Sequence, residues 1–545
     1  MIFVLGSLAF FASLNNTILI LRSLSTPASA TAAESDDAAA SQGESLSSLS
    51  FPIVEVGVGL IACNLPSFGG SQIIQSLPHK VRHARDSMTE ALNHPIRDDC
   101  APTTPPMSHS TKDWTIDTVN ELTSIYFIAF CNMVGSNKLR IAISGGGLAG
   151  AALANILFRQ DHLEVQLFES APEFSERGQA ISVAINAQHA LARVVPDAED
   201  LLKRAGAVPM HSTRLLMGNG PAAGAKVIDL AEEHPGRIVH RAAFLRELLA
   251  PLPRENMHTN KKLVAVEKAQ ENSLLLRFAN GSTAEVDALI GADGLFGFVR
   301  SHVLGADHEA VEPVAAGWAA VHNLVPFAKA RDKLGAHLFD QDRQYGWIGD
   351  GGLMMHDVLS NGETVQCVGA FVDHNPSKDR KKPCDCTHLE SAFAGWLNGP
   401  VAKGMIDLLL DQDEPAAYAQ WEHRDAPTYA KDRVCVMGDS AHAMTPWQGS
   451  GGAIALEDAV VLGALFAQIR SADQIEGALK AYDAVRRPRA QPIAASSRLT
   501  GCIMTGLVEE LGTDPIKMHD ALKDRWNFIH DFDLGKHVAD AIAML

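Results

Sequence analysis

Three glycines that directly follow an apolar run are the feature that most limits how this chain can fold. Residues 141–144 (Ile-Ala-Ile-Ser) have the composition of a buried strand, and Gly145, Gly147 and Gly150 follow with the spacing GxGxxG. The first glycine permits a tight turn, the second lets the backbone approach a pyrophosphate, and the third lets a helix pack closely on the strand. Residues 148–159 continue with helical spacing of apolar side chains. The pattern predicts a strand, a turn and a helix that together bind a phosphate group.

A second strand supplies the acidic residue that such a fold needs. Residues 164–169 (Glu-Val-Gln-Leu-Phe-Glu) alternate as a strand does and end in Glu169, about twenty residues after the glycines. A carboxylate at this point can accept hydrogen bonds from ribose hydroxyls. Glycines, helix and terminal acid together predict a dinucleotide-binding fold.

Two further motifs that combine glycine with aspartate lie downstream. The first is DALIGADG at residues 287–294, which contains Asp293, and the second is RVCVMGDSAH at residues 433–442, which contains Asp439. The second continues through Gly449 and Gly451 to Gly452, which opens a predicted helix. A NAD-dependent dehydrogenase would usually complete its cofactor site around the first motif alone, so the additional motifs favour a different dinucleotide.

The three ordered motifs resemble those of the class A FAD-dependent aromatic monooxygenases, and in particular their salicylate hydroxylase-like branch. The match extends from Met133 to about residue 490. It implies FAD as the bound cofactor and NADH or NADPH as a transient co-substrate. It also implies a fold that is α/β plus α+β, in which a Rossmann-like FAD-binding domain of the GR2 type is joined to an antiparallel-sheet substrate domain and C-terminal helices.

The resemblance also implies which residues hold the flavin. Arg241 matches an arginine that contacts FAD, and Ala180 matches a small residue that lies against the cofactor. Asp293 is implied in both FAD and pyridine-nucleotide handling. Asp439 follows a buried strand, where its carboxylate can accept hydrogen bonds from the ribityl hydroxyls. Gly452 leaves the start of a helix open, and the positive end of that helix would stabilise the charge of reduced flavin.

The same comparison divides the chain into segments that alternate between two domains. Residues 1–132 form an N-terminal extension, and residues 501–545 form a C-terminal helical region. The FAD-binding domain is expected to take residues 133–207, 236–312 and 429–500, and the substrate domain residues 208–235 and 313–428.

Two histidines are the candidates for acid–base chemistry. His322 stands where many family members carry arginine, and His356 stands where others often show a Tyr-Pro pair. An imidazole near a phenol could help to deprotonate it and so activate the ring towards an electrophilic oxygen. For each histidine the alternative is a structural residue that forms hydrogen bonds.

The predicted reaction uses O2 and a small aromatic substrate. The resemblance implies a phenolic acid hydroxylated at the carboxyl-bearing carbon with loss of carbon dioxide, or beside it, in secondary metabolism. Two alternatives stay open: a hydroxylase or epoxidase of a larger polyketide or terpenoid, and a membrane-anchored, catalytically inert flavin-binding module.

Composition excludes other classes of function. The chain has 545 residues, and its net charge of -18 argues against a nucleic-acid partner, which needs clustered Lys and Arg. Cys384, Cys386 and His388 are close in sequence, but no second pair completes four ligands, so no metal site is predicted.

The N-terminal extension has a different character. Residues 1–21 carry no charge and are long enough to span a bilayer, and residues 1–70 resemble the end of a rhodopsin-like integral membrane protein. Residues 25–50 are rich in Ser, Ala and acidic side chains. The catalytic part is expected in the cytoplasm, with membrane association through residues 1–70 if the extension is native. The alternative is a gene-model join, since Met133 resembles a start codon.

Overall fold

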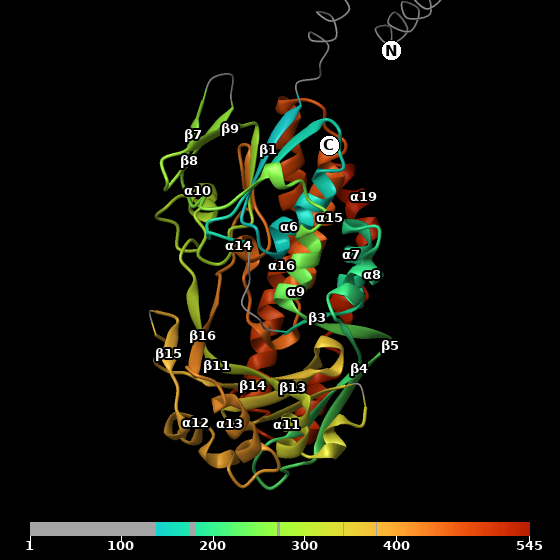
Figure 1. Ribbon diagram of the computed structural model, residues 1–545, viewed down its shortest axis with the longest axis vertical. Helices are drawn as coiled ribbons and strands as arrows, with labels where there is room; N and C mark the ends of the chain where they lie inside the picture. Colours follow the sequence, from blue (N-terminus) through green and yellow to red (C-terminus); the bar gives the residue numbers. More distant parts are fainter. Residues whose placement is uncertain (1–137, 175–179, 270–272, 342, 378) are drawn as a thin grey trace, which may run out of the picture. The chain divides into compact units, whose positions relative to one another are not determined.

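The computed structural model describes residues 138–174, 180–269, 273–341, 343–377 and 379–545 (Figure 1). The predictions for residues 1–132, including the membrane segment and the rhodopsin-like resemblance, lie outside these residues. In the ranges that are described, none of the helices combines the length and the apolar character needed to cross a membrane.

A six-stranded sheet carries the glycine motifs. Its order is β17-β18-β10-β1-β2-β6, and every neighbouring pair is parallel except β17 with β18. The strands are β1 (Leu139–Ser144), β2 (Leu163–Phe168), β6 (Met257–His258), β10 (Ala288–Gly291), β17 (Ala430–Lys431) and β18 (Val434–Val436). The β1 strand is almost entirely buried, as expected for a central parallel strand of Ile and Ala.

Helices rich in small residues pack beside this sheet. Helix α6 (Leu148–Leu157) contacts α15 (Gly451–Phe466), which also contacts α7 (Ile185–Val194) and α16 (Ile475–Met504). Buried alanines line α6, which lets its backbone approach the neighbouring elements closely. The smaller elements on this part of the chain are α8 (Ala198–Arg204), α9 (Arg241–Leu249), α10 (Val299–Leu304), α14 (Asp439–His442), and the three-stranded sheet β7 (Leu263–Lys268), β8 (Leu274–Phe278) and β9 (Thr283–Val286).

A nine-stranded sheet forms the second layer of the fold. Its order is β15-β16-β11-β14-β13-β12-β4-β5-β3, and it is antiparallel except between β12 and β4. The strands are β3 (Ala180–Val183), β4 (Val208–Met217), β5 (Lys226–His240), β11 (Val314–Pro326), β12 (Gln344–Gly349), β13 (Gly352–Leu359), β14 (Thr364–Val372), β15 (Lys381–Pro383) and β16 (Ala416–Glu422). The edge strand β3 comes from residues that precede β4 in the chain.

The two faces of this sheet bury different partners. One face packs under α11 (Phe327–Leu334), α12 (Cys386–Ala392) and α13 (Ala402–Leu410), in a cluster that includes Val321, Cys367 and Trp396. The opposite face packs against Trp447 and the end of α16. We call these the outer face and the inner face. Alternation along each strand therefore decides which side chains face the rest of the molecule.

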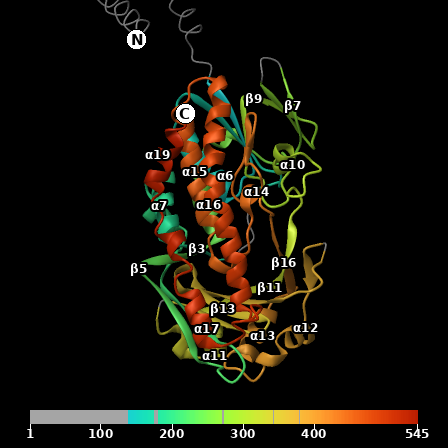
Figure 2. The same ribbon diagram turned by 180° about the vertical axis from the view of Figure 1, so that it is seen from behind.

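C-terminal helices complete the fold. Figure 2 shows α16 running along the six-stranded sheet towards α17 (Pro515–Leu522), which lies beside the nine-stranded sheet. The short α18 (Asn527–His530) and α19 (Leu534–Ile542) return along it. A parallel sheet with helices, a largely antiparallel sheet and C-terminal helices confirm the predicted fold class. The segment boundaries of the two domains stay a prediction.

Candidate functional site

The first turn of the glycine motif needs glycine for steric reasons. Gly145 has φ +112°, and a Cβ on it would lie 2.1 Å from the carbonyl oxygen of Ala292. Its N–H donates to the carbonyl of Phe168 at 2.7 Å. A Cβ on Gly150 would lie 1.9 Å from the carbonyl oxygen of Gly145. The turn and the first turn of α6 are therefore packed backbone against backbone, with Gly147 as the N-cap of the helix.

Glu169 lies beside this turn at the end of β2. Its carboxylate accepts hydrogen bonds from the backbone N–H of Gly146 at 2.8 Å and of Ala171 at 2.7 Å. The side chain is only partly buried. The acid predicted to contact a ribose is thus held next to the glycine turn with part of its surface open.

Asp439 is brought to the same end of the parallel sheet. It follows Gly438, which has φ +56° and approaches α6 so closely that a Cβ there would lie 2.8 Å from the Cβ of Ala149. Asp439 is exposed while Gly438 and Ser440 on either side are buried. A carboxylate is therefore presented to the surface beside the first turn of α6.

The start of α15 borders a hollow. It is lined by Leu148 of α6, Ile181 and Ser182 of β3, and Gly452 and Leu456 of α15. A Cβ on Gly452 would meet no other atom within 4 Å. Within the ranges that the structure describes, the N–H groups at the start of this helix therefore face this hollow next to β3.

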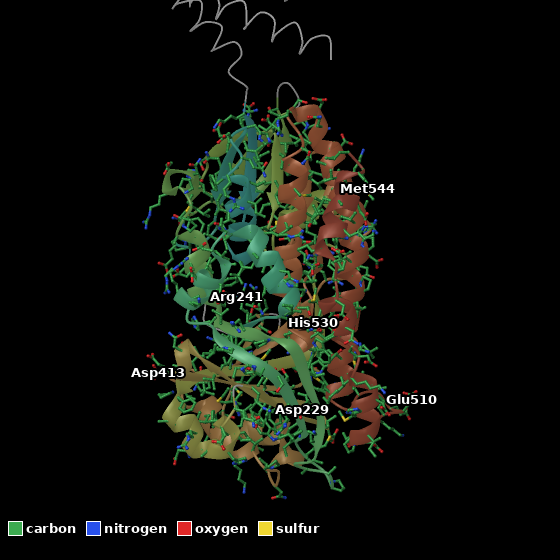
Figure 3. The ribbon with its side chains drawn as sticks, turned by 90° about the vertical axis from the view of Figure 1, so that its right-hand side faces the viewer. Asp229, Arg241, Asp413, Glu510, His530 and Met544 are labelled. Carbon is green, nitrogen blue, oxygen red and sulfur yellow. The ribbon has the colours of Figure 1, made fainter. Side chains whose placement is uncertain are left out.

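Arg241 and Ala180 approach each other at the edge of the nine-stranded sheet. Ala180 pairs with His240, the last residue of β5, and Arg241 opens α9 directly afterwards. Figure 3 shows Arg241 between the six-stranded part and the nine-stranded sheet. The structure thus brings together Ala180, Arg241 and the hollow at Gly452.

Both oxygens of the Asp293 carboxylate accept hydrogen bonds from other residues of the protein. One oxygen accepts from the N–H of Val299 at 3.0 Å and the other from the hydroxyl of Ser440 at 2.9 Å. Burial raises the pKa of Asp293, while these two hydrogen bonds act in the opposite direction. The side chain fastens the loop after β10 to the start of α14.

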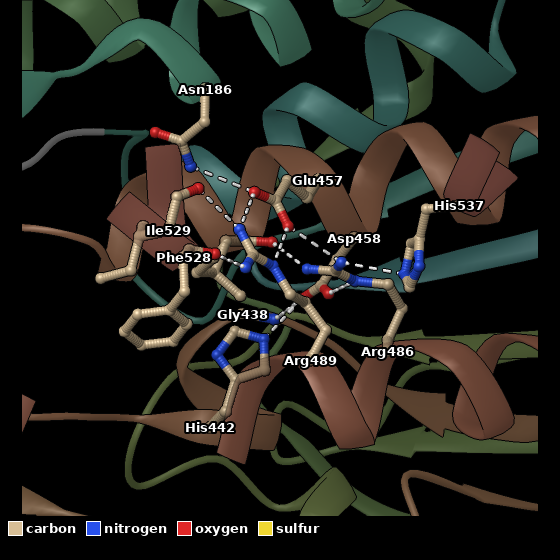
Figure 4. A network of polar contacts seen from close by, with 11 residues as sticks. Asn186, Gly438, His442, Glu457, Asp458, Arg486, Arg489, Phe528, Ile529 and His537 are labelled. Carbon is tan, nitrogen blue, oxygen red and sulfur yellow. Dashed lines mark hydrogen bonds and ion pairs between the residues drawn. The ribbon is translucent and has the colours of Figure 1, made fainter. Parts of the chain in front are cut away.

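A buried network of charged side chains joins α15 to α16 and to the turn at Gly438 (Figure 4). Asp458 accepts from Arg486 at 2.8 Å, from His442 at 2.6 Å and from the N–H of Gly438 at 2.9 Å. Its neighbour Glu457 accepts from Arg486 at 2.9 Å. Burial alone would raise the pKa of Asp458, but His442 and Arg486 outweigh it and lower this pKa to about 2. The network holds the turn that presents Asp439.

Glu457 also ties distant segments to this network. It accepts from Asn186 of α7 at 3.1 Å and from Arg489 at 3.2 Å. Arg489 in turn donates to the carbonyls of Phe528 and Ile529 at 2.6 and 2.8 Å. The acidic pair on α15 is visible in the sequence, but its long-range partners are not.

Rows of side chains cross the inner face of the nine-stranded sheet. Ala320, Ala370 and Leu353 face one another on adjacent strands and pack in the same cluster as Trp447. Gln366, on the same face, accepts a hydrogen bond from the N–H of Ala180 at 2.6 Å. The inner face therefore extends from the Trp447 segment to the start of β3.

His322 belongs to the row between these two limits. It lies opposite Val368, which lies opposite Met355. His322 is partly buried, and burial lowers its pKa to about 4. Among the described residues, its buried Nδ1 atom has no hydrogen-bond partner. The imidazole is therefore neutral near pH 7.

His356 lies on the outer face. Its ring stacks on Phe339 at 4.8 Å and lies 5.5 and 5.8 Å from the rings of Tyr345 and Trp347. It is fully buried, and burial lowers its pKa to about 3. The structure does not bring the two candidate histidines together.

These residues fit FAD. The cofactor needs N–H groups for its pyrophosphate, carboxylates for its hydroxyl groups, and space beside a helix N-terminus for its ring. The glycine turn, Glu169, Asp439 and the hollow at Gly452 supply them at one end of the parallel sheet. The space at Gly452, which a side chain would fill, is the strongest sign of this fit.

Comparison with known proteins agrees with this geometry. A family model described as FAD binding domain matches residues 244–497. The chain is 34% identical over 428 residues to 6-methylsalicylate 1-monooxygenase atA of Aspergillus terreus, covering 75% of this chain and 93% of that protein. It is 31% identical over 426 residues to a salicylate hydroxylase of Pseudomonas putida, covering 75% and 96%.

A solved structure shows the same fold. The structure of a salicylate hydroxylase substrate complex superposes with a TM-score of 0.65 at 27% identity, covering 74% of this chain and 98% of that one. These comparisons do not support the rhodopsin-like resemblance of residues 1–70 or a membrane association. They do support FAD and NAD(P)H as cofactor and co-substrate. The chain belongs to the salicylate hydroxylase-like family of FAD-dependent monooxygenases.

Proposed function

We propose that this chain hydroxylates a 2-hydroxybenzoate, related to salicylate or 6-methylsalicylate, at the carbon that bears the carboxyl group, with loss of carbon dioxide. The observation that carries the proposal is its similarity along almost the whole length of a 6-methylsalicylate 1-monooxygenase. With FAD bound, the chemistry supplied is reduction by NAD(P)H and activation of O2 for transfer of one oxygen atom to an electron-rich ring.

Nine residues are assigned to the cofactor. The glycine turn and the start of α6 would face the pyrophosphate, while Glu169 and Asp439 would accept from ribose and ribityl hydroxyls. The start of α15 would face the ring. The residues are Gly145, Gly147, Gly150, Glu169, Ala180, Arg241, Asp293, Asp439 and Gly452. For Asp293 we propose a supporting role, because both of its oxygens are bonded within the protein.

Removal of a single one of these groups tests the assignment. Asp439→Ala deletes a carboxylate that is exposed and so removes hydrogen bonds to the cofactor rather than to the core. The purified variant is expected to contain much less FAD than the wild type, at an unchanged melting temperature of the flavin-free protein. Normal flavin content would remove Asp439 from the site.

His322 is assigned to activate the substrate. Its Nδ1 atom would accept the proton of the phenolic hydroxyl, which leaves a phenolate that is more reactive towards an electrophilic oxygen. Support comes from its position on the inner face and from its Nδ1 atom, which has no hydrogen-bond partner among the described residues. His356 is assigned a structural role, because aromatic rings surround it on the outer face.

The deciding experiment measures substrate-dependent oxidation of NADH and NADPH. The FAD-loaded protein is mixed with salicylate, 6-methylsalicylate, 3-hydroxybenzoate or benzoate, and the product mass is determined. Replacement of the carboxyl group by a hydroxyl is expected with the two 2-hydroxybenzoates. A product 16 mass units heavier that keeps its carboxyl group would instead indicate hydroxylation beside that carbon. Turnover with none of the four acids would contradict the substrate class.

A further inference from the structure

A row of polar side chains crosses the inner face of the nine-stranded sheet. Thr213 of β4 lies opposite Gln344 of β12, and Asp357 of β13 lies opposite Gln366 of β14. Gln344 joins the two pairs by donating to the Asp357 carboxylate at 2.6 Å. Asp357 and Gln366 are only 3% and 4% exposed. A carboxyl group is therefore sealed inside the sheet between two carboxamides.

The direction of the hydrogen bonds is fixed at the Ala180 end of the row, because a backbone N–H can only donate, whereas the Thr213 hydroxyl at the other end can donate or accept. Thr213 donates its hydroxyl hydrogen to the amide oxygen of Gln344 at 2.9 Å, so the amino group of Gln344 faces Asp357. At the other end the N–H of Ala180 donates to the amide oxygen of Gln366 at 2.6 Å, which leaves the amino group of Gln366 to donate to Asp357, directly opposite it on β13. Both carboxamides thus donate to one carboxylate, which accepts from two sides.

The row ends at the flavin side of the fold. Ala180 is the first residue of β3, and the next two residues of that strand, Ile181 and Ser182, line the hollow at Gly452. A residue that holds the amide of Gln366 in place therefore also holds the backbone of Ala180, where the strand that lines the hollow begins.

The geometry points to Asp357 as a positioning residue of the flavin site: its carboxylate orients Gln366, and Gln366 holds the backbone of Ala180 against the cofactor. This inference rests on the proposed function for the identity of the cofactor and the reaction. Asp357 touches neither, so its effect passes through Gln366.

The chemistry of the buried carboxyl agrees with this role. Burial raises the pKa of Asp357 to about 6, and the hydrogen bonds from Gln344 and Gln366 oppose that rise. A buried carboxylate with two amide donors is stable only while both donors stay in place. The residue next to it in sequence, His356, faces the other way and takes no part.

Asp357→Leu tests the assignment with little change in side-chain volume. Leucine accepts from neither carboxamide, so the amino group of Gln366 loses the acceptor that orients it, and the amide oxygen is no longer held towards the N–H of Ala180. FAD is expected to dissociate roughly tenfold more readily in a flavin-fluorescence titration, as loss of one buried hydrogen bond predicts. A larger fraction of the NAD(P)H consumed should end as hydrogen peroxide.

A double variant restores the pattern and separates positioning from simple destabilisation. In the double variant Asp357→Asn with Gln366→Glu, the new carboxylate accepts from Ala180 and from the asparagine, whose oxygen accepts from Gln344. The dissociation constant of FAD is expected to return to within about twofold of the wild type, since every donor regains an acceptor. Asp229→Leu, which changes a carboxylate paired with Arg214 on the outer face, is the matched control and should leave the FAD titration unchanged.

Each outcome decides one question. An unchanged FAD dissociation constant and flavin absorbance in folded Asp357→Leu would overturn the positioning role, as would a double variant that folds without normal FAD affinity. If Asp357→Leu does not fold, the double variant decides alone: folding with normal FAD affinity supports the role, and failure to fold overturns it. Absence of turnover with 2-hydroxybenzoates in the wild type would contradict the proposed function only, because the FAD titration needs no substrate.

Discussion

His322 and His356 lie on opposite faces of one sheet, two strands apart, with β14 between them. His322 shares the inner face with Ala320 and Val368, whereas His356 is covered by Phe339 on the outer face. The two imidazoles therefore cannot share one substrate, and their variants should behave differently.

His322→Gln should slow hydroxylation while leaving the flavin reducible. Loss of a general base costs roughly 10²-fold in the step that it assists. Reduction of FAD by NAD(P)H, followed by stopped-flow absorbance, is expected within about twofold of wild type because no proton of the substrate moves in that step. NAD(P)H that is consumed without hydroxylation of the substrate should yield hydrogen peroxide. Hydroxylation at the wild-type rate would show that another group activates the phenol.

His356→Phe should keep full hydroxylation and change how stability depends on pH. Burial depresses the pKa of folded His356 to about 3, below the ordinary value of 6.5 in the unfolded chain. Its contribution to stability is therefore complete above about pH 6.5 and is lost as the pH falls towards 3. Denaturant unfolding from about pH 7 to about pH 4.5 should show a smaller fall in the free energy of unfolding for the variant than for wild type. An equal fall would place the imidazole in contact with water.

Gly452→Leu should give a folded protein that binds little FAD. A side chain here meets open space and not protein, so folding is unaffected, but the hollow at the start of α15 is filled. Gly477→Leu is the matched control, because Gly477 also lies in a helix with nothing within 4 Å of its Cβ position. Flavin absorbance per protein and far-ultraviolet circular dichroism check both variants. Equal flavin content in the two would exclude the start of α15 from the cofactor site.

Arg486→Met should be strongly destabilising. Its guanidinium is fully buried between Glu457 and Asp458, and its removal leaves both carboxylates without their principal cation. Breaking a buried pair in this way costs about 3–5 kcal/mol in the free energy of unfolding. Lys480→Met, on the same helix, removes an exposed pair with Glu476 and should cost less than about 1 kcal/mol. Urea unfolding of the two variants checks the difference, which should largely vanish if water reaches the network.

A chain that starts at Met133 is expected to fold, bind FAD and turn over. All residues assigned to the cofactor lie after that point, and so do both sheets of the fold. Expression of residues 133–545 and measurement of bound flavin check this expectation. An insoluble or flavin-free product, beside an active full chain, would give residues 1–132 a function.

The sequence was enough to predict those parts of the fold and site that depend on neighbours in the chain. Gly145 and Gly150 are required by contacts within a few residues of one turn, so their spacing alone predicted the turn. Glu169 and Asp439 were predicted from their positions at strand ends, and the structure places both beside the start of α6.

The orientation of the strand residues could not be predicted in the same way. Side chains alternate between faces, so a difference of one residue in register exchanges His356 for Asp357 on the inner face. The partners of Glu457 were also inaccessible, because Asn186 lies 271 residues away in the chain. Only the pairing of strands and helices shows which of these groups meet.

Helix α16 contacts both large sheets. Near its start Tyr482 donates to the carbonyl of Val436 in the six-stranded sheet, and near its end Ile503 packs on the nine-stranded sheet. Pro488 and Pro492 lie between the two anchors, and neither can donate a helical hydrogen bond. The helix that joins the two sheets is therefore without two of its internal hydrogen bonds between the points where it contacts them.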